Sequence, residues 1–217
     1  DYPSTESFHE SDDYVDYTED IYVGYRYFET IPGASEKVNY PFGYGLSYTE
    51  FEWNFDSLEM STDAINANTK FTATVTVTNV GDMAGKDVVE VYMSAPYTAG
   101  GIEKAATQLL GFAKTPMLQP GEKATVEVEF DAYDIAAYDW SDANDNGYAC
   151  WEIEAGAYNF TINKNSHEVV ATETVELAEC ILDKAQATGN TVENRFVDSP
   201  EEGAKFNYTS ISPTMTI

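Results

Sequence analysis

The sequence predicts a mainly β protein whose central part is an antiparallel β-sandwich. Seven short segments alternate polar with apolar or β-branched residues, which is the period of a half-buried strand. Turn residues such as Gly81, Pro120, Gly121 and Gly156 separate several of these segments, and no clear helical period occurs among them. Strands at this spacing favour two sheets that each bury one face.

The first part of the chain lacks this alternation. Residues 1–20 are acidic and polar without a helical or strand period, so they are expected to form an extended arm. The segment IYVGYRYF (21–28) is rich in aromatic and β-branched residues and predicts a strand, which Pro32 and Gly33 would end. A lone strand cannot satisfy its own edge, so it is expected to pair with a sheet elsewhere in this chain or in a partner.

The expected strands of the sandwich are TEFEWNF (49–55), KFTATVTVTNV (70–80), DVVEVYMS (87–94), AATQLLGFAK (105–114), KATVEVEF (123–130), ACWEIEA (149–155) and AYNFTINK (157–164). Their period of two predicts which side chains line the inner faces. These are Val75, Val77, Val89, Val91, Val126, Val128, Phe130, Trp151, Ile153, Tyr158 and Phe160.

Beyond the last of these segments the pattern weakens. Residues 170–186 permit either a strand or a short helix, and residues 186–217 are mostly polar and aperiodic, as in a linker or a surface tail.

Charge narrows the classes of partner. The chain has 38 Asp and Glu against 11 Lys and Arg, a formal net charge of -27, which repels nucleic acid and anionic membranes. There is no apolar run of ~18 residues and no export signal, so a cytoplasmic location is favoured. Cys150 and Cys180 lie outside metal-type spacing and are expected to be thiols rather than a disulfide.

One loop has a partial metal-binding pattern. Asp142, Asn144 and Asn146 match the start of a calcium loop, D-x-N-x-N-G, but the closing carboxylate position is occupied by Ile153. A solvated hairpin loop is therefore favoured over a calcium site, and no cofactor is expected. With only His9 and His167, the chain also lacks material for a zinc cluster or a Ser-His-Asp triad.

Aromatic residues are numerous enough to form a sugar-binding platform. Its candidate members are Tyr44, Tyr48, Trp53, Tyr92 and Tyr97, of which Tyr44 and Tyr97 are retained as candidate substrate-binding residues. The competing interpretation, core or cross-strand packing, is the stronger one for aromatics that alternate along strands.

Seven segments, in order along residues 19–162, resemble glycoside hydrolase family 3, the β-glucosidases and related exo-acting enzymes. They are EDIYVGYRYFE (19–29), VNYPFGYGLSYTEFEW (38–53), VTNVGDMAGKDVVEVYMSAPY (77–97), GIEKAATQLLGFAKT (101–115), LQPGE (118–122), YDIAAYD (133–139) and WEIEAGAYNFTI (151–162). The resemblance implies three parts: the end of an α/β sandwich domain (1–47), a fibronectin type III-like domain (48–165), and a linker towards a missing domain (166–217).

The resemblance also implies where the chemistry lies. Family members hydrolyse β-glycosidic bonds with retention, using an Asp nucleophile and, in many members, a Glu acid/base, and neither motif is visible here. The chain alone is therefore expected to be inactive, with its partners being the catalytic domains of the same enzyme. Glu19, Tyr25 and Arg26 match family motif residues and are interpreted as structural or supporting.

Residues 188–196, TGNTVENRF, resemble the connection in members with reversed domain order, which are mostly bacterial. The chain then looks like the middle of a longer enzyme. Two alternatives stay open: an independent carbohydrate-binding or adhesion module, and a calcium-dependent β-module.

Overall fold

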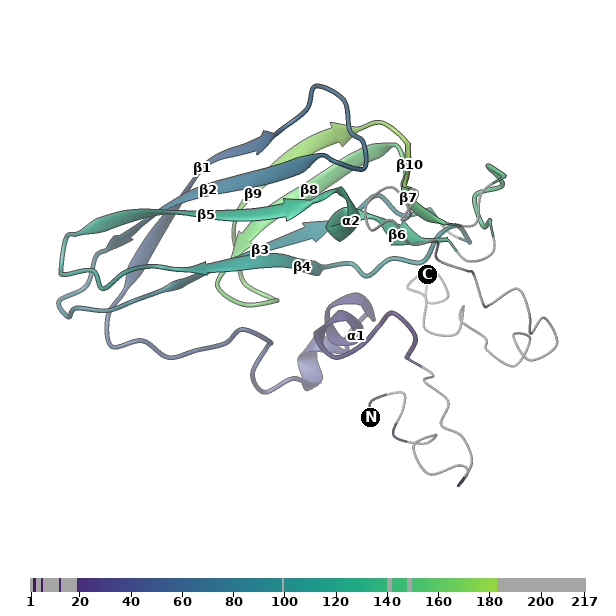
Figure 1. Ribbon diagram of the computed structural model, residues 1–217. Helices are drawn as coiled ribbons and strands as arrows, with labels where there is room; N and C mark the ends of the chain where they lie inside the picture. The colour runs from purple at the N-terminus through teal and green to yellow at the C-terminus, as the bar shows by residue number, and fades with distance from the viewer. Residues whose placement is uncertain are drawn as a thin grey trace.

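Six of the seven predicted segments form strands of two antiparallel sheets that pack face to face (Figure 1), whereas the segment at 149–155 contributes Trp151–Ile153 to a separate small sheet. The structure is a computed structural model that describes residues 2, 5, 12, 19–98, 100–139, 142–147 and 150–182. One sheet has the order β1-β2-β5, and the other has the order β4-β3-β8-β9. The bounds are β1 Phe51–Met60, β2 Lys70–Asn79, β3 Val88–Ser94, β4 Gln108–Lys114, β5 Lys123–Asp131, β8 Gly156–Asn163 and β9 Val169–Leu177. The predicted fold class is confirmed.

A third, smaller sheet lies at one end of the sandwich. It has the order β10-β7-β6, with β6 at Ala137–Tyr138, β7 at Trp151–Ile153 and β10 at Cys180–Leu182. The short helix α2, Ala132–Ile135, leads into it, and a capping box between Asp131 and Asp134 starts that helix. The other short helices are α1, Tyr25–Thr30, and the 3₁₀ turn η2, Ser35–Lys37. None of the helices in the described part of the chain is long and apolar enough to cross a membrane.

The core lies between the two large sheets. Stacked rings of Phe71 on β2, Phe130 on β5 and Phe160 on β8 occupy its centre, with ring centroids 5.2 to 5.7 Å apart. Every predicted core residue is buried except Trp151, which is only partly buried and packs against the edge of the core. The period of two therefore identified the inner faces correctly, because side chains alternate strictly between the faces of a strand.

The predicted strand at 21–28 is wrong. Its second half forms α1, and Gly24, with a φ of 62°, turns the chain just before that helix. Aromatic and β-branched composition favoured a strand, but residues 25–30 form a helix whose side chains bond to the backbone near the start of β4. The Tyr25 ring instead packs against Tyr92 on the outer face of the four-stranded sheet, beside which α1 lies (Figure 1).

The range assigned to a linker also begins too early. Residues 169–177 form β9, which pairs along its length with β8, and residues 180–182 form β10. The alternative of a short helix over this range is excluded for these strands. Residues 183–217, most of the arm at 1–18 and His9 lie outside the described residues.

The two cysteines sit near the small sheet. Cys180 pairs with Ile153, three residues along from Cys150, and the two are not joined by a disulfide. This offset corresponds to ~10 Å along a strand, beyond the ~7 Å that a disulfide can bridge.

The stacked phenylalanines predict where stability resides. Phe160→Ala should lower the free energy of unfolding by about 3–5 kcal/mol, because it opens a cavity between two rings that cannot collapse freely. Phe112→Ala is the matched control, since that ring is 68% exposed on β4 and its loss should cost no more than about 0.5 kcal/mol. Urea denaturation of both variants measures this difference in stability. Similar denaturation midpoints for the two variants would contradict the prediction.

Candidate functional site

Residues 19–30, here called the N-terminal motif, are attached to the sandwich through hydrogen bonds of their Tyr and Thr hydroxyl groups. The Leu109 backbone N–H donates to Tyr25 Oη at 2.8 Å, and the Ala106 N–H donates to Thr30 Oγ1 at 2.9 Å. The Tyr25 ring also meets Tyr92 edge to face, with centroids 6.0 Å apart. Leu109 is the second residue of β4, an edge strand of its sheet, so α1 covers part of an edge that would otherwise expose unpaired N–H groups.

A second attachment is made by Glu103. The hydroxyl of Tyr22, which is 1% exposed, donates to one oxygen of this carboxylate, and the hydroxyl of Tyr97 donates to the other at 3.3 Å. Burial, followed by the hydrogen bond to Glu103, raises the pKa of Tyr22 far above its ordinary value, so its hydroxyl stays a donor. Tyr97, a candidate for substrate binding, thus helps to hold the N-terminal motif.

Glu19 and Arg26 do not form an ion pair with each other. Glu19 is 6% exposed, and its Oε2 has no hydrogen-bond partner among the residues that the structure describes. Arg26 lines a cavity and forms no ion pair within the described part of the chain. The supporting roles assigned to Glu19, Tyr25 and Arg26 remain predictions, although the contacts of Tyr25 are of the structural kind.

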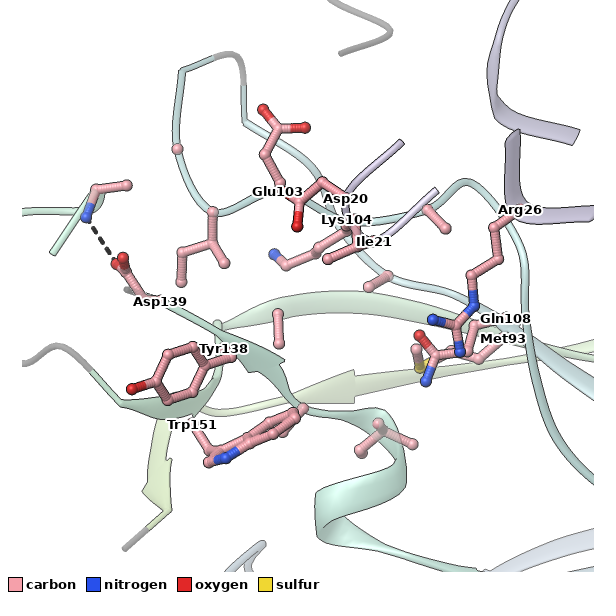
Figure 2. Close-up of a pocket in the computed structure, with 18 of the residues that line it drawn as sticks. Asp20, Ile21, Arg26, Met93, Glu103, Lys104, Gln108, Tyr138, Asp139 and Trp151 are labelled. Atoms are coloured by element: carbon pink, nitrogen blue, oxygen red, sulfur yellow. Dashed lines mark hydrogen bonds between the residues drawn. The ribbon is translucent and has the colours of Figure 1, made fainter. Parts of the chain in front are cut away.

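A cavity of about 480 Å³ lies between this motif, the 100–108 loop and the small sheet. Figure 2 shows Arg26 and Gln108 on one side of it, and Tyr138 and Trp151 on the other. Asp139 closes one end, where its carboxylate accepts the Ala143 N–H at 2.7 Å. The size is typical of small-molecule sites. Sequence reasoning missed this cavity, because its walls come from segments far apart in the chain.

The charged groups of the wall are partly committed to other contacts. The ammonium of Lys104 binds the Glu154 carboxylate and the Pro96 carbonyl, the latter at 2.8 Å. Burial, together with the nearby Glu103 charge, raises the pKa of Asp20 above its ordinary value. Arg26 is thus the cation of the wall that has no ion-pair partner among the described residues.

The loop with the calcium-like pattern directs its side chains to protein partners. The Asp142 carboxylate accepts the N–H groups of Asn146 and Gly147, at 2.9 and 3.1 Å. The amides of Asn144 and Asn146 donate to Glu152 Oε2, at 2.9 and 2.7 Å. Glu152 is fully buried, and burial raises the pKa of its carboxyl. The loop therefore braces β7, and no group of three His, Cys, Asp or Glu suited to a metal occurs within the described ranges.

The aromatic candidates do not form one platform. Tyr92 is buried and donates to Glu90 at 2.7 Å, and Trp53 donates to Asp87 from the other sheet at 2.8 Å. Tyr44 packs against Tyr40, with ring centroids 5.1 Å apart. Substrate binding by Tyr44 and Tyr97 remains a prediction.

The crossover segment, residues 38–48, packs tightly at one point and is exposed elsewhere. Gly43 has a φ of 85°, which L side chains rarely adopt, and an added Cβ would lie 2.4 Å from both carboxylate oxygens of Glu90, so the Glu90 side chain would have to move. The Ser166 N–H also donates to the Phe42 carbonyl at 2.8 Å. The exposed side chains of the segment are large and apolar: Tyr40, Phe42, Tyr44, Leu46 and Tyr48, from 46% to 96% exposed.

Comparison with known proteins first defines the sandwich as a fibronectin type III-like domain, whose family model matches residues 87–166. β-Glucosidase A of Butyrivibrio fibrisolvens is 48% identical over 192 residues, which cover 84% of this chain and 23% of that protein. The crystal structure of a β-glucosidase from Paenibacillus barengoltzii is 38% identical, with a TM-score of 0.72 over 82% of this chain and 19% of its own.

A β-glucosidase of Kluyveromyces marxianus in complex with glucose is 33% identical, with a TM-score of 0.67 over 82% of this chain and 20% of its own. The chain belongs to glycoside hydrolase family 3 and matches the part of these enzymes that contains the fibronectin type III-like domain. It spans less than a quarter of the length of these relatives, which are larger multidomain β-glucosidases. Because they include bacterial and fungal proteins, the expected bacterial source is not established.

The hydrogen bond to Tyr25 predicts a measurable cost. Tyr25→Phe should lower the free energy of unfolding by about 1–2 kcal/mol, because the Leu109 N–H loses its acceptor. It should also speed hydrogen exchange at the Leu109 amide. Tyr48→Phe, at a side chain that is 96% exposed, is the control and should change neither quantity. Unchanged exchange at Leu109 in Tyr25→Phe would show that α1 is not anchored through this bond.

The buried carboxyl of Glu90 should make the free energy of unfolding depend on pH. Burial raises the pKa of its carboxyl in the folded protein above the ordinary value of 4.5, although the Tyr92 hydroxyl partly opposes this. The stabilisation from this shift is fully present below pH 4.5 and is lost as the pH rises through the folded-state pKa. Glu90→Gln should therefore raise the free energy of unfolding at pH 7 by about 1 kcal/mol, and the difference should vanish at acid pH.

Glu127→Gln is the control for this measurement, because Glu127 is exposed on β5. Denaturation of the three proteins between pH 4 and pH 8 tests the effect. A Glu90→Gln protein that is less stable than the wild type at pH 7 would mean that the crossover segment requires the ionised carboxylate.

Proposed function

We propose that this chain is a non-catalytic segment of a β-glucosidase-type glycoside hydrolase. It stabilises the catalytic domains and contributes to shaping the substrate cleft. The parent enzyme hydrolyses terminal β-glycosidic bonds with retention, and its catalytic carboxylates lie outside residues 1–217. The similarity to multidomain β-glucosidases supports the class of parent enzyme.

The observation that carries this proposal is the two-sided packing of the N-terminal part. Tyr22, Tyr25 and Thr30 fix it to the sandwich through hydrogen bonds. The apolar side chains of the crossover segment face outwards, and Val23 is 57% exposed. Large exposed apolar residues gathered on one segment are typical of a surface that another domain covers. A role as a non-catalytic segment that packs on other domains therefore accounts for both observations: the N-terminal part is fixed to the sandwich, and the crossover segment offers apolar side chains for another domain to cover.

The alternative is an independent carbohydrate-binding or adhesion module. The cavity between Arg26 and Trp151 is the feature that favours it, because such a module needs a ligand site of its own. The exposed crossover aromatics favour the scaffold, since an independent module would leave them in water.

An assay of hydrolysis tests whether the chain alone is an active enzyme, which neither of these two functions requires. The purified chain should show no turnover of aryl β-glucosides, whereas an enzyme that joins it to the catalytic domains of the family should be active under the same conditions. Turnover that survives repurification of the chain and disappears on changing one of its acids would place the active site within residues 1–217. Replacing Leu46 and Tyr48 by Ser in the longer enzyme should lower its melting temperature while leaving that of the isolated chain nearly unchanged, because only the longer enzyme covers them.

A further inference from the structure

The cavity has the space of a ligand site because small residues form much of its wall. Gly101, Ala105, Ala136 and Ala143 line it where larger side chains would fill the volume of about 480 Å³. Its walls come from the N-terminal motif, the loop before β4 and the small sheet, so the fold brings them together (Figure 2). The attachments of Tyr22 and Thr30 hold the N-terminal wall in place.

One wall is aromatic. The rings of Tyr138 on β6 and Trp151 on β7 meet at 62°, with centroids 5.4 Å apart, and both side chains are only half-buried. Aromatic rings offer flat apolar faces with a polar handle, and they pack well against the C–H face of a pyranose ring. A ligand with one apolar face therefore has a surface to pack on.

The opposite wall supplies hydrogen-bonding groups. Arg26 carries five N–H donors in a planar fork and has no ion pair among the described residues. Gln108 lies beside it in Figure 2, with its Nε2 donating to the Asp134 carbonyl at 2.8 Å. Asp20 adds a carboxylate acceptor. Donors and acceptors on one wall suit hydroxyl groups, which act as both.

The charge of the wall restricts the ligand further. Asp20, Glu103, Asp134 and Asp139 line the cavity against Arg26 and Lys104, in a chain of net charge -27. This excess of carboxylates disfavours an anion. We propose that the cavity binds a short neutral saccharide, packed on Tyr138 and Trp151 and hydrogen-bonded to Arg26 and Asp20. The choice of a sugar rests on the proposed function, and this site is separate from hydrolysis.

Titration of the ¹⁵N-labelled chain with glucose and cellobiose tests the site. We expect saturable shifts of the amides of Ile102, Gln108 and Tyr138, with a Kd on the order of 1 mM for the tighter sugar. Glucuronate, which differs from glucose by a carboxylate, should bind about 10-fold more weakly or not at all. Product signals in the same spectra report any hydrolysis, so failure of the proposed function is detected separately from failure to bind.

Two variants locate the binding. Arg26→Gln and Tyr138→Ala should each weaken it about 10-fold or more, whereas Phe112→Ala, outside the cavity, should leave it unchanged. Trp151 is left intact because it packs against the core. An amide spectrum that is unchanged outside the cavity shows that each variant is folded. Three outcomes would overturn the proposal: no saturable shifts, binding that survives both variants, or glucuronate that binds as tightly as glucose.

Discussion

The covering of both faces of β3 is the constraint on which the rest of the structure depends. Val89, Val91 and Met93 face the core, as in any sandwich strand, but Glu90 and Tyr92 on the outer face are buried as well. They are buried because α1 and the crossover segment lie on that face, with Tyr25 against Tyr92 and Gly43 against Glu90. Part of the four-stranded sheet is therefore a middle layer.

Buried carboxylates in this middle layer need hydrogen-bond donors, and the chain has few Lys and Arg side chains to supply them. Tyrosine hydroxyls supply several of them: Tyr22 and Tyr97 donate to Glu103, and Tyr92 donates to Glu90. A phenolic hydroxyl hydrogen-bonds a carboxylate while its ring packs in an apolar layer. This is a physical use for three of the 16 tyrosines in a chain of 38 acidic residues. Lys104 instead supplies a cation to Glu154.

The sequence predicted the sandwich well because strand alternation is a local signal. The run from Phe71 to Val77 alternates with threonines, and its apolar members are fully buried or nearly so. It failed at 21–28, where composition favoured a strand but tertiary contacts of Tyr25 and Thr30 produced a helix. The family motifs located the residues of the N-terminal part. The cavity could not be predicted, because Arg26, Gln108 and Trp151 come together only through the fold.

The position of Gly43 has a consequence for how such modules can be separated from their enzymes. A boundary drawn from sequence homology falls near residue 48, or later at the 87–166 match, yet the glycine and the tyrosine that cover β3 lie before it. A sandwich excised at residue 49 would present Glu90, Tyr92 and the β4 edge to water, and so would offer a sticky sheet surface for self-association. The stretch of chain that sequence homology defines as the domain is thus shorter than the stretch that folds without exposing this sheet surface.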